Sequence, residues 1–82
     1  MMAETSREAL LAKFSRSGRR NYSDAKRLLE AWEFELRRSR WGHAVWVHFC
    51  GLTLTISTER ELGAYYQSLV VRVISQLQLF DD

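Results

Sequence analysis

The apolar positions predict three amphipathic helices, because they recur at steps of three and four residues. The first helix follows Thr5-Ser6-Arg7-Glu8, which has the S/T-x-x-E form of a capping box, and it ends before Gly18. The second helix begins near Tyr22, with Ser23 as the expected N-cap. The apolar stripe of the first helix is Ala9, Leu10, Leu11 and Phe14, and that of the second is Ala25, Leu28, Leu29 and Trp32. A third helix closes the chain, with the apolar stripe Tyr66, Leu69, Val70, Val73, Ile74 and Leu77.

From Glu33 the apolar period changes to two, which is typical of strands with one buried face. Strands are expected from Phe34 onward, over 43–49 and over 52–56. Trp41-Gly42 and Cys50-Gly51 are the expected tight turns, and 57–63 is expected to be a polar connection. The predicted order is α-α-β-β-β-α. This is an α+β fold in which helices pack on a three-stranded antiparallel sheet.

Length and cysteine content narrow the class of protein. The chain has 82 residues, which is enough for a single domain. Its single cysteine, Cys50, forms no intrachain disulfide, no secretory signal is recognisable, and the apolar runs are too short to cross a bilayer. We therefore expect a cytoplasmic protein with no membrane partner.

The distribution of charge favours a polyanionic ligand. The net charge is only +2, but all 12 basic residues except Arg60 and Arg72 lie within 7–40. A basic half of this kind is suited to nucleic acid, and the alternative is a solvated helix surface. The loop residues Arg16, Arg19 and Arg20 are either a second RNA contact or an exposed basic loop.

His43 is the main candidate for chemistry. Gly42 places it at the start of an apolar strand, directly after an arginine cluster at 37, 38 and 40. A histidine both accepts and gives a proton near neutral pH, and arginines bind phosphate. On a regular strand Arg38 and Arg40 share one face and Arg37 takes the other. Arg40, nearest the turn, is the favoured phosphate ligand, and the alternative role for Arg37 and Arg38 is a solvated surface. The alternative is an ordinary strand-end histidine with no catalytic role.

Residues 24–78 resemble the HicA toxin family of small bacterial ribonucleases. The similarity lies in the helix and aromatic of 25–34, the strand Trp41-Gly42-His43-Ala44-Val45-Trp46-Val47-His48, the following Gly51, and a closing helix opened by Glu61-Leu62-Gly63. The resemblance implies a fold like a double-stranded RNA-binding domain, with residues 1–21 as an added helix and basic loop on a 22–82 core. It also implies cleavage of mRNA by the motif histidine without a cofactor, and silencing by a HicB-like antitoxin in a homo- or hetero-oligomer.

The chain departs from the family pattern at three positions. Trp41 occupies the usual place of the first glycine of the turn, Ala44 replaces a second histidine found in many members, and Glu33 replaces a glycine. The first departure changes the approach to RNA, and the second removes a helper for His43.

The residues that we assign to the site are His43 as the catalytic acid/base and Arg38, Arg40, Trp41 and Gly42 as RNA-binding residues. Trp41 is expected to stack on a base or to contact the antitoxin, because nothing obvious buries it, whereas mid-strand Trp46 is expected to pack in the core.

Strand alternation places His48 on the face opposite His43, in a structural or peripheral role. His48 and Cys50 share a face, but two ligands without a third do not make a zinc site. The alternative function is a non-catalytic RNA-binding or protein-interaction module on the same fold.

Overall fold

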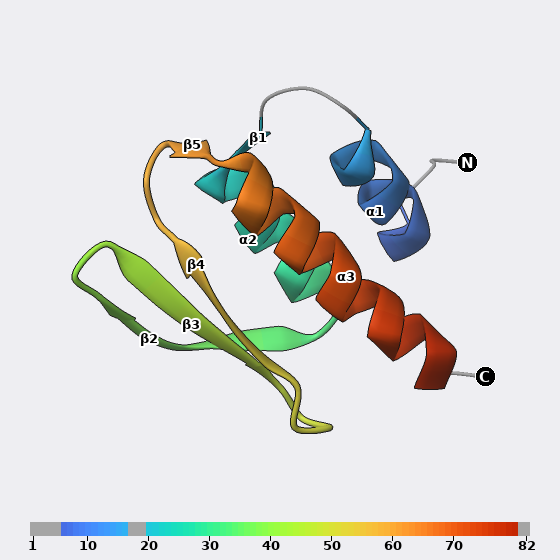
Figure 1. Cartoon of the computed structure of the whole chain (residues 1–82). Helices are drawn as coiled ribbons and strands as arrows, with labels where there is room; N and C mark the ends of the chain where they lie inside the picture. Colours follow the sequence, from blue (N-terminus) through green and yellow to red (C-terminus); the bar gives the residue numbers. More distant parts are fainter. Residues whose placement is uncertain (1–5, 17–19, 81–82) are drawn as a thin grey trace.

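The computed structural model describes residues 6–16 and 20–80 (Figure 1). The elements are α1 (Arg7–Ser15), β1 (Arg20–Asn21), α2 (Tyr22–Ala31), β2 (Phe34–Arg40), β3 (His43–His48), β4 (Thr53–Ser57), β5 (Glu61–Leu62) and α3 (Ala64–Phe80). Strands β2, β3 and β4 form an antiparallel meander, with α2 and α3 on one of its faces and α1 packed against both helices. The predicted α+β class and the three-stranded antiparallel sheet with helices on it are confirmed.

Helix α2 buries the stripe that the sequence predicts. Ala25, Leu28, Leu29 and Trp32 are each at most 1% exposed. The prediction of Ser23 as N-cap was wrong: the N-cap is Asn21, whose side chain accepts from the backbone N–H of Asp24 at 2.9 Å, while Asp24 accepts from Asn21 N–H at 3.2 Å. This reciprocal pair satisfies two backbone donors at once, which explains why the helix begins two residues earlier.

The two faces of β3 differ sharply in burial. Ala44, Trp46 and His48 are buried against the helices, while His43 is exposed and Val45 and Val47 are half-buried. The face that carries His43, Val45 and Val47 is called the open face below, because α2 and α3 both lie on the other side of the sheet (Figure 1). The strand ends at His48 rather than at Phe49, and β4 begins at Thr53 rather than at Leu52.

The segment expected to be a polar connection contains a strand. Glu61 and Leu62 form β5, which pairs antiparallel with Asn21 and Arg20 of β1. Leu62 is buried, and its carbonyl accepts from the Gln67 side chain at 2.9 Å, which ties β5 to the first turns of α3. This pairing holds the start of α2 beside the start of α3.

Helix α1 is capped by Ser6, whose hydroxyl accepts from Ala9 N–H at 3.1 Å. Thr5, the residue expected to open the capping box, lies outside the described residues. Trp32 anchors the helix to α2: its indole N–H donates to the Arg7 carbonyl at 3.0 Å, and the Arg7 guanidinium lies 4.3 Å from its ring centroid. Of the apolar residues predicted for α1, Leu11 and Phe14 are buried and Ala9 is exposed.

Helix α3 covers β4 and completes the core with Val70, Val73, Ile74 and Leu77, all buried as expected. Of the paired tyrosines at its start, Tyr66 is half-buried and Tyr65 is exposed. Among the described residues, no helix is both long enough and apolar enough to cross a membrane.

Candidate functional site

The β2–β3 turn consists of two residues with left-handed backbone. Trp41 has φ 57° and Gly42 has φ 78°, as a tight hairpin turn requires when both central residues have positive φ. Gly42 adopts this conformation without strain, but Trp41 does so against the clash of its Cβ with the backbone. The Trp41 side chain is 86% exposed. A large aromatic ring is therefore held in solvent on a strained turn.

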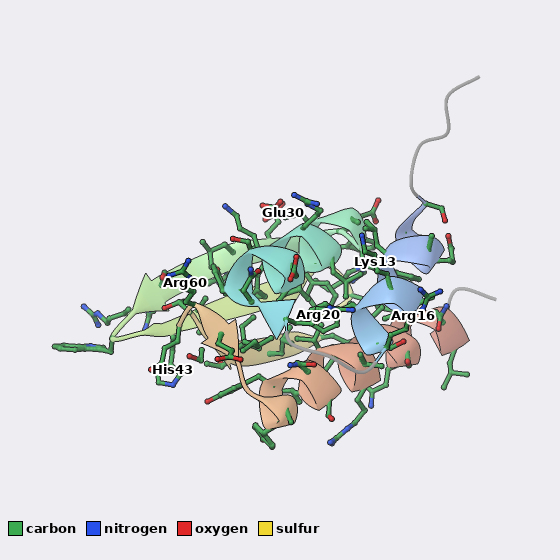
Figure 2. All side chains as sticks on the ribbon, turned by 90° about the horizontal axis from the view of Figure 1, so that it is seen from above. Lys13, Arg16, Arg20, Glu30, His43 and Arg60 are labelled. Carbon is green, nitrogen blue, oxygen red and sulfur yellow. The ribbon has the colours of Figure 1, made fainter. Side chains whose placement is uncertain are left out.

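His43 follows this turn on the open face, and its side chain projects outward at the hairpin end (Figure 2). Its Nδ1 lies 3.2 Å from the Trp41 carbonyl oxygen. Because a carbonyl only accepts, this hydrogen bond requires the proton on Nδ1. In the neutral ring the lone pair then resides on Nε2, which is the arrangement that a general base needs.

Two arginines of β2 share the open face with His43. Arg40 is the cross-strand partner of His43, and Arg38 is the partner of Val45. Directly opposed residues in an antiparallel pair project from the same face, so Arg40 and Arg38 lie on the same face of the sheet as His43. Both side chains are exposed, and neither forms an ion pair within the described part of the chain.

Arg37 does not follow the expected alternation. The register of β2 against β3 shifts between Leu36 and Arg38, so Arg37 is the extra residue of a β-bulge. It has no partner on β3, and simple alternation no longer assigns it to the face opposite Arg38. The structure therefore brings together His43, Arg40 and Arg38 from the predicted site, at the Trp41-Gly42 turn.

Two of the three basic residues predicted as a second RNA contact, Arg16 and Arg20, lie just after α1 and at the start of β1. Arg20 donates to the Lys13 carbonyl at 2.6 Å and so closes the end of α1. Arg16 is exposed beside α3, and Arg19 lies outside the described residues. Figure 2 shows Lys13, Arg16 and Arg20 together, away from His43.

His48 is buried on the helix side of the sheet, at 6% exposure, on the face opposite His43. Its Nδ1 accepts from the Cys50 backbone N–H at 3.1 Å, and its ring lies 5.2 Å from Phe34 and 4.4 Å from Phe49. Cys50 is exposed in the following turn. Over residues 6–16 and 20–80, no group of three or more histidine, cysteine or carboxylate side chains is arranged to hold a metal ion.

Trp46 is packed in the core as predicted, at 1% exposure, and faces Tyr22. Burial raises the pKa of the Tyr22 phenol; the Trp46 indole N–H lowers it, and the charge of Glu30 raises it again. Within the described residues the indole N–H forms no hydrogen bond of regular geometry.

Sequence reasoning missed a groove at the other end of β3, with a volume of about 460 Å³. Its lining includes Glu30, Glu33 and Glu35, together with His48 and Phe49. The signal available in the sequence was Glu33, a carboxylate at the position where the HicA pattern has glycine. Glu33 has φ 70°, the left-handed backbone that glycine adopts most easily.

No protein-family model, curated protein or solved structure matches this chain. Its function is therefore inferred from the side chains at the two ends of β3.

Proposed function

We propose that this chain is a metal-independent endoribonuclease of the HicA type, which cleaves mRNA in the cytoplasm and is silenced by a HicB-like antitoxin. The observation that carries the proposal is the contact of His43 Nδ1 with the Trp41 carbonyl at 3.2 Å, which leaves Nε2 as the basic atom of an exposed ring. Arg40 and Arg38 on the same face supply the positive charge that a phosphodiester requires.

The reaction uses a nucleophile that RNA itself supplies. His43 Nε2 removes the proton of a ribose 2′-OH, and the 2′ oxygen attacks the adjacent phosphorus. The bond from phosphorus to the 5′ oxygen breaks, and that oxygen takes a proton from water or from the imidazolium. The products are a 2′,3′-cyclic phosphate and a 5′-OH. Arg40 stabilises the charge that develops on the phosphoryl oxygens, and the positioned acid/base contributes about 10²–10⁴-fold.

The test is cleavage of a labelled single-stranded RNA by wild type, His43→Ala and His43→Gln, with excess EDTA in every reaction. We expect only wild type to cut. Gln76→Ala, an exposed change on α3, is the matched control and should cut normally. An RNA with 2′-deoxyribose at the cut position should resist cleavage there. Unchanged cleavage by His43→Ala, or cleavage of the 2′-deoxy RNA, would refute the mechanism.

A second candidate is a non-catalytic RNA-binding module on the same fold. It is favoured by the absence, within the described residues, of any hydrogen bond or ion pair from His43 to a carboxylate or a second histidine. In that case wild type and His43→Ala bind the RNA equally and neither cuts. A chain that neither binds nor cuts RNA is instead a protein-interaction module.

A further inference from the structure

The groove at the far end of β3 is separate from the His43 hairpin. His43 is the first residue of β3, whereas His48, which lines the groove, is the last. Glu30, also in the groove lining, and His43 lie on different sides of the molecule (Figure 2). The groove is formed where the end of α2 meets β2 and the β3–β4 turn. Its lining residues and its charge therefore differ from those of the His43 hairpin.

The charge of this groove is the reverse of that at the hairpin. Glu30, Glu33 and Glu35 all line it, against one arginine, Arg37. None of the three carboxylates forms an ion pair within the part of the chain that the structure describes. With three carboxylates against one guanidinium, and all three carboxylates exposed, the groove holds a net negative charge. This charge disfavours RNA and favours a cation.

His48 supplies a hydrogen-bond donor to the same groove. Its Nδ1 accepts from Cys50 N–H, so in the neutral ring the proton is on Nε2. Within the described residues this Nε2 has no hydrogen-bond partner, and Trp46 Nε1 is the fully buried side-chain atom that lacks one, so His48 Nε2 is open to solvent although the residue as a whole is only 6% exposed. Because it is accessible, this Nε2–H can donate to an acceptor carried by a ligand in the groove.

Phe49 gives the groove an aromatic surface. Its ring stacks on His48, with the centroids 4.4 Å apart and the planes 28° from parallel, yet the residue is 84% exposed. The ring is thus fixed on one side by His48 and free on the other. A planar cation stacks on such a face more favourably than a compact one.

We propose that this groove binds an arginine-bearing segment of another polypeptide. The guanidinium stacks on the free face of Phe49 and pairs with Glu33 and Glu35, and a main-chain carbonyl of the segment accepts the His48 Nε2–H. A polyamine carries only donors and so offers no acceptor to the His48 Nε2–H. A divalent metal is not favoured, because no three ligands converge among the described residues.

The experiment titrates the full chain, labelled with ¹⁵N, with acetyl-Gly-Arg-Gly-amide and follows the backbone amide signals. We expect shifts at Glu33, Glu35 and Cys50 and none at His43. The matched peptide containing citrulline keeps the shape of arginine without its charge and should not bind. Glu33→Gln with Glu35→Gln should weaken binding about fivefold or more, whereas Glu59→Gln, an exposed change elsewhere, should not. Phe49→Ala should remove the preference for the arginine peptide over its lysine counterpart.

The proposal is overturned if the arginine peptide shifts no groove signal, if the citrulline peptide or spermidine binds equally well, or if the double glutamine variant binds as wild type does. These outcomes are independent of the ribonuclease proposal, because no groove residue takes part in the His43 chemistry. Loss of RNA cleavage with intact peptide binding would refute only the proposed function, and the reverse result would refute only the groove.

Discussion

Glu33 and Trp41 lie immediately before and immediately after strand β2, and both have left-handed backbone, with φ 70° and φ 57°. They are the non-glycine residues with positive φ in the described part of the chain. Each strained residue belongs to a different site, Glu33 to the acidic groove and Trp41 to the His43 turn. Strain of this kind costs about 1–2 kcal/mol per residue and is concentrated at functional positions.

Trp41→Gly should stabilise the fold. Glycine adopts the left-handed turn without the Cβ clash, and the exposed indole contributes little packing, so we expect a gain of about 1 kcal/mol. Urea unfolding measures it, with Tyr65→Gly on α3 as an exposed aromatic-to-glycine control that should instead destabilise. If Trp41 stacks on a base of bound RNA, the same variant should lose affinity by about 1–3 kcal/mol. A less stable Trp41→Gly would show that the indole has a packing role.

Glu33→Gly should likewise make the protein more stable but weaken binding, in this case binding of the arginine peptide to the groove. We expect the free energy of unfolding to rise by about 1 kcal/mol, because the residue after the α2 C-cap would then be glycine in its preferred left-handed conformation. The variant also lacks a groove carboxylate, so the arginine peptide should bind more weakly. Glu33→Gln separates the two effects, since it should weaken binding without stabilising the protein. A Glu33→Gly variant with unchanged peptide affinity would count against the groove.

Trp32→Phe should loosen helix α1. It removes the hydrogen bond from the indole to the Arg7 carbonyl and part of the buried ring, at a cost of about 1–3 kcal/mol. Amide hydrogen exchange should accelerate in 7–15 more than in β3. Trp46→Phe is the matched control, because its indole N–H forms no regular hydrogen bond among the described residues. Equal acceleration of α1 in both variants would contradict the anchoring role of Trp32.

Tyr22 should make stability depend on pH in the alkaline range. Burial raises the pKa of its phenol in the folded state, so the folded protein retains the proton more strongly than the unfolded chain. Its contribution is fully present below the ordinary tyrosine pKa and is lost as the pH rises through the raised folded pKa. Urea unfolding as a function of pH measures the slope. Tyr22→Phe should flatten it, and the exposed Tyr65→Phe should leave it unchanged.

Arg40→Ala should weaken RNA binding in a salt-dependent manner if Arg40 contacts phosphate. Loss of one contact should make the slope of log K against log salt concentration less negative by about 0.7 for a single strand. Arg72→Ala, an exposed change on α3, removes the same charge away from the hairpin and should leave the slope unchanged. Equal slopes for the two variants would show that Arg40 acts only through net charge.

The sequence predicted those parts of the fold that depend on periodicity. Ala25, Leu28, Leu29 and Trp32 identified the buried face of α2 because helical spacing places them on one side. Alternation along β3 likewise separated His43 from His48. Such patterns are local, so a single segment contains the whole signal.

Features that depend on a partner segment were not predictable in this way. The β1–β5 pair is two residues long on each side, which is too short to show a period. The bulge at Arg37 exists only relative to the register of β3. Asn21 and Ser23 are both good N-cap residues, and the choice between them depends on the reciprocal bond with Asp24. The acidic groove combines residues of α2, β2 and β3, so no stretch of sequence contains it.

The distance between His43 and His48 along β3 determines how far a partner bound in the groove must extend to cover His43. Five residue steps separate them, which corresponds to about 16 Å along a strand, and they project from opposite faces. A partner chain anchored by an arginine in the groove therefore needs a linker of at least about five extended residues, and more to round the edge of the sheet, before it can cover His43. Linker length should then determine how strongly such a partner shields the histidine, with a sharp loss below that span.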